Sequence, residues 1–138
     1  MRRGLNFLPR VVFGVLIVAV TWLTLTPNPD DTRSGLALTR WLAEVLFRNE
    51  SLGDKVAHFL VYALLGAAAV WADLTVFSRK WGVAVALALY GVALEGLQGL
   101  GGVRAPEFAD ALANASGAAA GLSGASLAVA ALRRMRAA

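Results

Sequence analysis

The stretch KVAHFLVYALLGAAAVWADL, residues 55–74, decides the fold class. It is long and apolar enough for a bilayer, since about 20 such residues cross a hydrocarbon core. Within the hydrocarbon core, a single segment can satisfy all of its backbone hydrogen bonds only as a helix. Three similar runs lie at residues 8–26, 81–101 and 108–132. The sequence therefore predicts an all-α integral membrane protein with four transmembrane helices.

The composition agrees with this prediction. Hydrophobic residues make up 58% of the 138-residue chain, and the mean hydropathy is +0.63. An ordinary soluble domain of this length cannot cover its surface with so few polar residues. The length suits a single domain, residues 1–138. Without cysteine, disulfides, thiolate nucleophiles and cysteine-ligated metals are excluded.

The basic residues predict the orientation of the helices. Three segments, before the first run, between the second and third, and after the fourth, hold eight basic residues and no acid: Arg2, Arg3, Arg10, Arg79, Lys80, Arg133, Arg134 and Arg136. With four spans, these segments lie on one side of the membrane, and the positive-inside rule makes that side cytoplasmic. We therefore expect a multi-pass protein of the bacterial cytoplasmic (inner) membrane with both termini inside. The net charge of +4 is then explained by membrane topology and contact with lipid headgroups, and it does not indicate a nucleic-acid-binding surface.

A shorter segment, residues 33–48, is amphipathic and is expected outside the cytoplasm. One face carries Leu38, Leu42, Val45 and Leu46, and the other carries Arg40, Glu44 and Arg48. We expect an interfacial helix with Trp41 at headgroup depth. A lid packed on the helix bundle is an equally open alternative.

Polar residues in or beside the last three runs converge at the outer end of the predicted bundle. The set comprises Asp54, Lys55, His58, Tyr62, Glu95, Gln98, Arg104, Asp110 and Asn114. Ionisable groups in a span cost free energy unless they face a partner or a wet cavity. We take Glu95, His58 and Asp110 as candidate catalytic residues and the other six as candidate binding residues.

Each of these residues also has a purely structural interpretation. Asp54 and Asp110 could cap helices, and Lys55 could extend its ammonium group towards the headgroups. Glu95 has no capping role, because its run continues on both sides of it. Small residues predict close helix packing, without deciding the oligomeric state: Gly91, Gly96, Gly99, Gly117, Gly121 and Gly124.

Several motifs together resemble the VanZ-like family of bacterial membrane proteins. They are TLTPNP (residues 24–29), DKVAHFLVYALLG (54–66), EGLQ (95–98), Arg104 and FADALANASGAAAG (108–121). All nine polar residues above lie in or beside these motifs. The resemblance implies a role in the cell envelope, in tolerance of glycopeptide antibiotics such as teicoplanin.

Two main functions remain open from the sequence. The outer site could bind a lipid-linked cell-wall precursor or a glycopeptide. Alternatively, it could be an enzyme site for a polyprenyl-phosphate substrate, with Glu95 and His58 in acid–base roles and Lys55 and Arg104 binding phosphate. A metal site of His58, Glu95 and Asp110 is less favoured, because no local motif such as H-E-x-x-H is present. No cofactor is therefore predicted. A proton-coupled carrier is disfavoured, since the polar residues do not form a path across the membrane.

Overall fold

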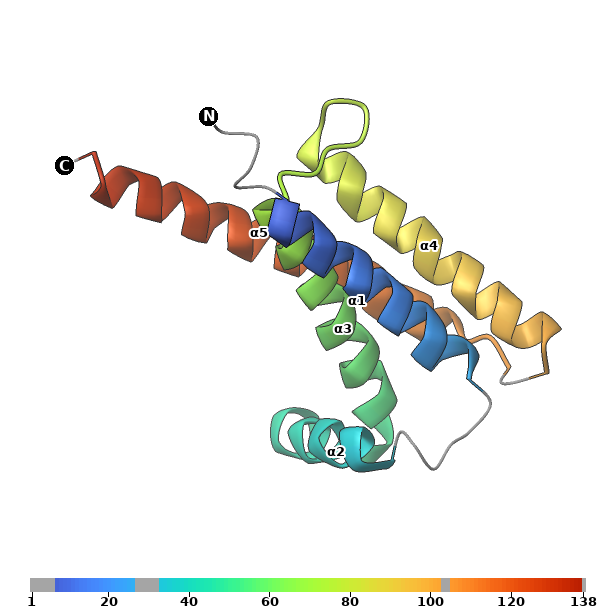
Figure 1. The fold of residues 1–138 in the computed structure, drawn as a ribbon. Coiled ribbons are helices and arrows are strands. Elements are labelled where there is room, and N and C mark those ends of the chain that lie inside the picture. Colours follow the sequence, from blue (N-terminus) through green and yellow to red (C-terminus); the bar gives the residue numbers. More distant parts are fainter. Residues whose placement is uncertain (1–6, 27–32, 103–104, 138) are drawn as a thin grey trace.

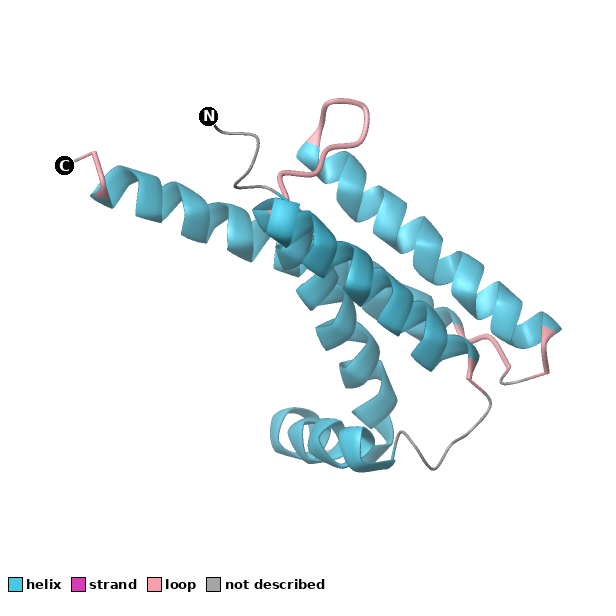
Figure 2. Cartoon of the chain, viewed as in Figure 1, coloured by secondary structure: helices cyan, strands magenta, loops and turns pink. Residues whose placement is uncertain are grey.

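The computed structural model describes residues 7–26, 33–102 and 105–137. Figures 1 and 2 show that the described chain is built from helices. The elements are α1 (Phe7–Leu25), α2 (Arg33–Phe47), the 3₁₀ turn η1 (Glu50–Leu52), α3 (Gly53–Trp71), α4 (Lys80–Leu100) and α5 (Phe108–Met135). All of these helices except α2 and η1 are long and apolar enough to cross a membrane. The predicted all-α class and its four long apolar helices are confirmed.

The long helices alternate in direction, which separates their ends into two groups. The start of α1, the α3–α4 turn and the end of α5 lie in the upper part of Figure 1. The end of α1, the start of α3 and the α4–α5 connection lie in the lower part, together with α2. At the upper end, Arg10 Nε donates to the carbonyl of Ala72, at 3.2 Å, and so joins the start of α1 to the end of α3.

A tight turn reverses the chain between α3 and α4. Val76 and Arg79 exchange backbone hydrogen bonds of 3.0 and 3.1 Å. The two residues between them, Phe77 and Ser78, have φ of 49° and 59°, in the left-handed region that non-glycine residues rarely adopt. Gly82 lies against this turn, where an added Cβ would meet the carbonyl oxygen of Val76. The turn therefore sets how α4 leaves α3.

Close packing of α3 on α5 forms the centre of the bundle. A Cβ on Gly117 would collide with the backbone of Phe59, and one on Gly121 with the backbone of Ala63. From the other side, a Cβ on Gly66 would collide with the backbone of Ala118. Small residues allow such approach in lipid, where van der Waals packing replaces the hydrophobic drive.

Two of the glycines predicted to pack do not do so. Gly96 and Gly124 have no neighbouring atom within 4 Å of the position a Cβ would take. Both lie on exposed faces of their helices. Gly91 and Gly99 do pack, against Asn114 and Tyr62 and against Pro106 respectively. The prediction is therefore wrong for Gly96 and Gly124.

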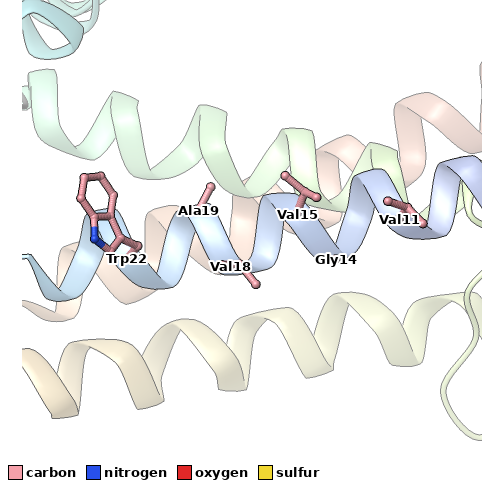
Figure 3. A pocket seen from close by; sticks show the side chains of 6 residues that line it. All are labelled: Val11, Gly14, Val15, Val18, Ala19 and Trp22. Carbon is pink, nitrogen blue, oxygen red and sulfur yellow. The ribbon is translucent and has the colours of Figure 1, made fainter.

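The outer surface of α1 is apolar along most of its length. An open groove of about 540 Å³ runs over it and is lined by Val11, Gly14, Val15, Val18, Ala19 and Trp22, as Figure 3 shows. Of the described α1 residues, Val20 alone is buried. A surface of this kind is what a helix shows to acyl chains, and it lies apart from the polar residues described below.

Helix α2 lies across the start of α3 (Figure 1) and contacts it through small side chains. Thr39 and Ala43 are buried, and Gly53 of α3 packs directly against Arg40. The large residues of its predicted apolar face are mainly exposed: Leu38 (61%), Val45 (58%) and Leu46 (64%), with Leu42 partly covered. Thus α2 does not cover the bundle with its apolar face, as a lid would.

Candidate functional site

Three helix ends bring the predicted polar residues together at the lower end of the bundle. Helix α3 contributes its first turns, α4 its last turns and α5 its first turns. Glu95, Asp110 and Asn114 are buried, with 5%, 0% and 1% of their surface exposed. Since α4 runs opposite to α3 and α5, residues far apart in sequence reach the same depth, as predicted. We call His58, Glu95, Asp110 and Asn114, together with Lys55, the polar cluster.

Lys55 makes the ionic contacts at the edge of the polar cluster. Its Nζ lies 2.7 Å from Asp110 Oδ1, 3.1 Å from Asp54 Oδ2 and 2.5 Å from Glu107 Oε2. An ammonium group has three donors, so these contacts engage all of them. The predicted use of Lys55 to bind phosphate would therefore require it to give up a carboxylate.

His58 lies between the two buried carboxylates. Its Nδ1 is 3.0 Å from Asn114 Oδ1, within hydrogen-bond distance. Glu95 Oε1 lies 3.9 Å from the same nitrogen, and Asp110 Oδ2 lies 3.9 Å from Nε2. An amide oxygen accepts, so this contact places the proton of a neutral imidazole on Nδ1 and leaves Nε2 as an acceptor facing Asp110.

The site is buried but can be reached from its edge. The side chains of His58 and Lys55 are each 20% exposed, whereas those of Glu95 and Asp110 are 6% and 1% exposed. A group that enters past His58 would therefore meet the carboxylates with little water around them. Electrostatic interactions are stronger under such conditions than in bulk water.

Tyr62 and Gly91 form the inner boundary of the polar cluster. Tyr62 is 3% exposed, and its ring lies 6.2 Å from that of Tyr90. A Cβ on Gly91 would lie 2.9 Å from Asn114 Nδ2 and 3.0 Å from the Tyr62 hydroxyl. Gly91 therefore leaves the space that lets Asn114 and Tyr62 meet α4. The sequence identified Gly91 as a packing residue without relating it to the site.

Gln98 and Asp54 have local roles in this arrangement. The Gln98 amide donates to the carbonyl of Thr24 and so holds α4 to the last turn of α1. Asp54 pairs with Lys55 in the first turn of α3, where a carboxylate also favours the helix dipole. Neither Asp54 nor Asp110 occupies the N-cap position, since Leu52 and Glu107 are the N-cap residues of their helices. Arg104, predicted as a binding residue, lies outside the described residues.

Glu107 contacts Lys55 in the structure but was not among the residues predicted from the sequence. It directly precedes α5 and lies against Lys55 Nζ, with 47% of its side chain exposed. The signal that could have found it is its place at the same predicted depth as Asp110. The sequence alone does not pair it with Lys55, because an acid before a helix also has a simpler role at the helix dipole.

The polar cluster offers two kinds of chemistry. An imidazole beside two buried carboxylates can accept and donate protons. The same donors can hold a metal ion, because one ligand atom each of His58, Glu95 and Asp110 lies within 4.8 Å of the others. No protein-family model, curated protein or solved structure matches this chain.

Proposed function

We propose that this chain is a VanZ-like protein of the bacterial cytoplasmic membrane whose polar cluster faces outwards and confers tolerance of glycopeptides such as teicoplanin. In this proposal, the cluster binds the polar headgroup of a lipid-linked cell-wall precursor or of the antibiotic. The observation that carries it is the position of the buried polar residues. In the described long helices, the buried polar residues Glu95, Gln98, Asp110 and Asn114 all lie towards one end of the bundle. They occupy the second half of α4 and the first half of α5.

The charge distribution supports the outward orientation. The end of the bundle opposite the polar cluster carries Arg10, Arg79, Lys80, Arg133 and Arg134 at helix ends. Acidic Asp54, Glu107 and Asp110 gather at the other end. By the positive-inside rule, this distribution supports a polar cluster at the extracytoplasmic face.

The exposed face of α2 supports a position at the outer membrane surface. Leu38, Trp41, Val45 and Leu46 share one side of α2 and are each at least 58% exposed. An exposed apolar face of this size needs a partner, and the adjacent lipid supplies one. In this proposal α2 lies in the headgroup region beside the polar cluster, where the headgroup of a lipid-linked molecule would also lie.

The chemistry of the cluster favours a ligand that presents hydrogen-bond donors. Lys55 is already engaged by Asp54, Glu107 and Asp110. The other charged side chains near His58 are the buried Glu95 and Asp110 carboxylates, which are acceptors. Sugar hydroxyls and amines, which both precursors and glycopeptides carry, would suit these acceptors better than a phosphate.

Teicoplanin sensitivity tests this proposal. A susceptible bacterial strain would express the wild type, Glu95→Gln or Asp73→Asn at matched membrane levels. Asp73 is a carboxylate at the opposite end of the bundle and is 63% exposed, which makes it a matched control. We expect the wild type and Asp73→Asn to raise the inhibitory concentration several-fold and Glu95→Gln to lose this effect. Equal protection by Glu95→Gln would contradict the proposal.

A second candidate function is an enzyme acting on a lipid-linked substrate at the outer leaflet. The 3.9 Å separations of His58 from both Glu95 and Asp110 favour it, because they place a proton acceptor beside two carboxyl groups. Mass spectrometry of lipid extracts from the same three strains tests it. A lipid that changes with the wild type and Asp73→Asn but not with Glu95→Gln would support catalysis. Identical lipid profiles, with tolerance that depends on Glu95, would support binding.

A further inference from the structure

We propose that His58, Glu95 and Asp110 form a binding site for a divalent transition-metal ion. The three residues come from α3, α4 and α5, and a ligand atom of each lies within 4.8 Å of the other two. Glu95 and Asp110 are buried and His58 is half-buried. The site goes beyond the proposed function and does not depend on which ligand or reaction the protein serves.

The orientation of His58 is the first argument for a metal. Its Nδ1 lies 3.0 Å from Asn114 Oδ1, while its Nε2 lies towards Asp110 Oδ2 at 3.9 Å. Histidines that bind metals usually donate their other ring N–H to a carbonyl or carboxylate oxygen, which fixes the tautomer. Asn114 is 1% exposed and therefore well placed for this role.

The contacts of Asp110 give the second argument. Its Oδ1 lies 2.7 Å from Lys55 Nζ, which fixes the carboxylate and directs Oδ2 towards His58. Such contacts outside the metal's own ligands orient the ligating carboxylate.

The distances are close to those of a metal site. Bonds of about 2.0 Å from zinc to nitrogen and oxygen place tetrahedral ligand atoms about 3.3 Å apart. Asp110 Oδ2 lies 3.9 Å from Nε2, the nitrogen left for the ion, which is somewhat longer than this value. Glu95 lies 3.9 Å from Nδ1 instead, and must turn towards Nε2 to join the same ion, within the 4.8 Å that bounds the three ligand atoms. The 20% exposure of the His58 side chain leaves a way in for the ion.

The donor set indicates which metals would bind. One imidazole and two carboxylates suit zinc or manganese, whereas magnesium and calcium prefer oxygen ligands alone. A set of three protein ligands leaves at least one coordination position for water or a bound ligand, as in catalytic rather than structural zinc sites. We therefore assign the site to Zn²⁺ or Mn²⁺.

Metal binding can be measured on the full chain in detergent. The affinity tag must be removed, because His58 is the one histidine of the chain and a polyhistidine tag would dominate the signal. After treatment with a chelator, the protein is titrated with Zn²⁺, Mn²⁺ or Mg²⁺. Bound metal is determined by elemental analysis, and the thermal unfolding midpoint is recorded. We expect about one Zn²⁺ or Mn²⁺ per chain, a raised midpoint and no effect of Mg²⁺.

Variants connect the ion to the assigned residues. Glu95→Gln and His58→Ala should weaken binding at least about 10-fold, and Asn114→Leu about 10- to 100-fold, as for residues that orient a ligand. Asp73→Asn, which removes a carboxylate far from the site, should bind as the wild type does. Glu95→Gln preserves shape and so serves if His58→Ala does not fold.

Two results would overturn the site. The first is a wild type that binds neither Zn²⁺ nor Mn²⁺ and shows no change in unfolding midpoint. The second is binding that persists in both Glu95→Gln and His58→Ala, since the ion would then lie elsewhere. Because no antibiotic or lipid substrate enters the measurement, either result leaves the proposed function to its own test.

Discussion

His58 and Asn114 meet across the interface of α3 and α5, with 3.0 Å between Nδ1 and Oδ1. They are 56 residues apart in the sequence, and each lies one or two turns from the start of its helix. The contact connects the most closely packed pair of helices to the polar cluster, so that the geometry of the site depends on the fit of α3 against α5. The glycines that allow that fit therefore help to shape the site.

Removing the Asn114 amide should uncouple His58 from α5. We expect Asn114→Leu to lower the free energy of unfolding by about 1–3 kcal/mol, since His58 loses its acceptor in a buried position. His58→Phe should cost a similar amount. A double-mutant cycle in detergent measures the coupling, which we expect to be about 1 kcal/mol because each change removes the same hydrogen bond. Strictly additive effects would mean that the two side chains do not interact.

Removing the Lys55 ammonium group should lower the free energy of unfolding more than removing the carboxylate of Glu107, its most exposed acidic partner. Lys55→Met leaves Asp110, whose side chain is 1% exposed, without this cation, and we expect a cost of about 3 kcal/mol. Glu107→Gln removes a carboxylate that is 47% exposed and should cost less than about 1 kcal/mol. Thermal unfolding of the purified variants measures both effects.

The double variant Lys55→Met/Asp110→Asn provides the control for this explanation. If the cost of Lys55→Met comes from an uncompensated Asp110 charge, neutralising Asp110 should recover part of it. A double variant less stable than Lys55→Met alone would show that Lys55 acts by packing or through Asp54 and Glu107 instead.

The sequence was sufficient for the parts of the structure that depend on local pattern and depth. Apolar length identified the four long helices, because satisfying the backbone in lipid leaves few alternatives. The alternation of direction then placed Glu95 near His58 and Asp110, since residues at equal depth on neighbouring helices come close. The convergence of the polar cluster therefore required no knowledge of side-chain contacts.

Features that depend on the rotation of a helix about its axis could not be predicted in this way. Glu95 and Gln98 share a face of α4, yet Glu95 lies near His58 and Gln98 donates to Thr24 of α1. Likewise, the periodicity of α2 identified its apolar face, but it could not show that Thr39 and Ala43 would pack on the bundle instead. The spacing of residues along one helix defines its faces, but it does not show which neighbouring helix each face contacts.

The two glycines Gly121 and Gly124 should respond in opposite ways to the same substitution. A Cβ on Gly121 collides with the backbone of Ala63, whereas Gly124 has open space. We expect Gly121→Leu to lower the free energy of unfolding by about 2 kcal/mol or more through overpacking. Gly124→Leu should be neutral or stabilising, because it gains helix propensity at no steric cost. Equal destabilisation by both would contradict the close α3–α5 packing.

The proposed orientation can be tested with single cysteines, since the natural chain has none. Ser51 lies exposed beside the start of α3, and Ser78 lies exposed in the α3–α4 turn, at opposite ends of the bundle. Cysteine is close to serine in size, so Ser51→Cys and Ser78→Cys should fold normally. In intact cells with a permeable outer envelope, a membrane-impermeant maleimide should label Ser51→Cys at once and Ser78→Cys only after lysis. The reverse pattern would place the polar cluster on the cytoplasmic side and contradict a role at the outer leaflet, whereas labelling of both before lysis would mean that these helices do not cross the membrane as proposed.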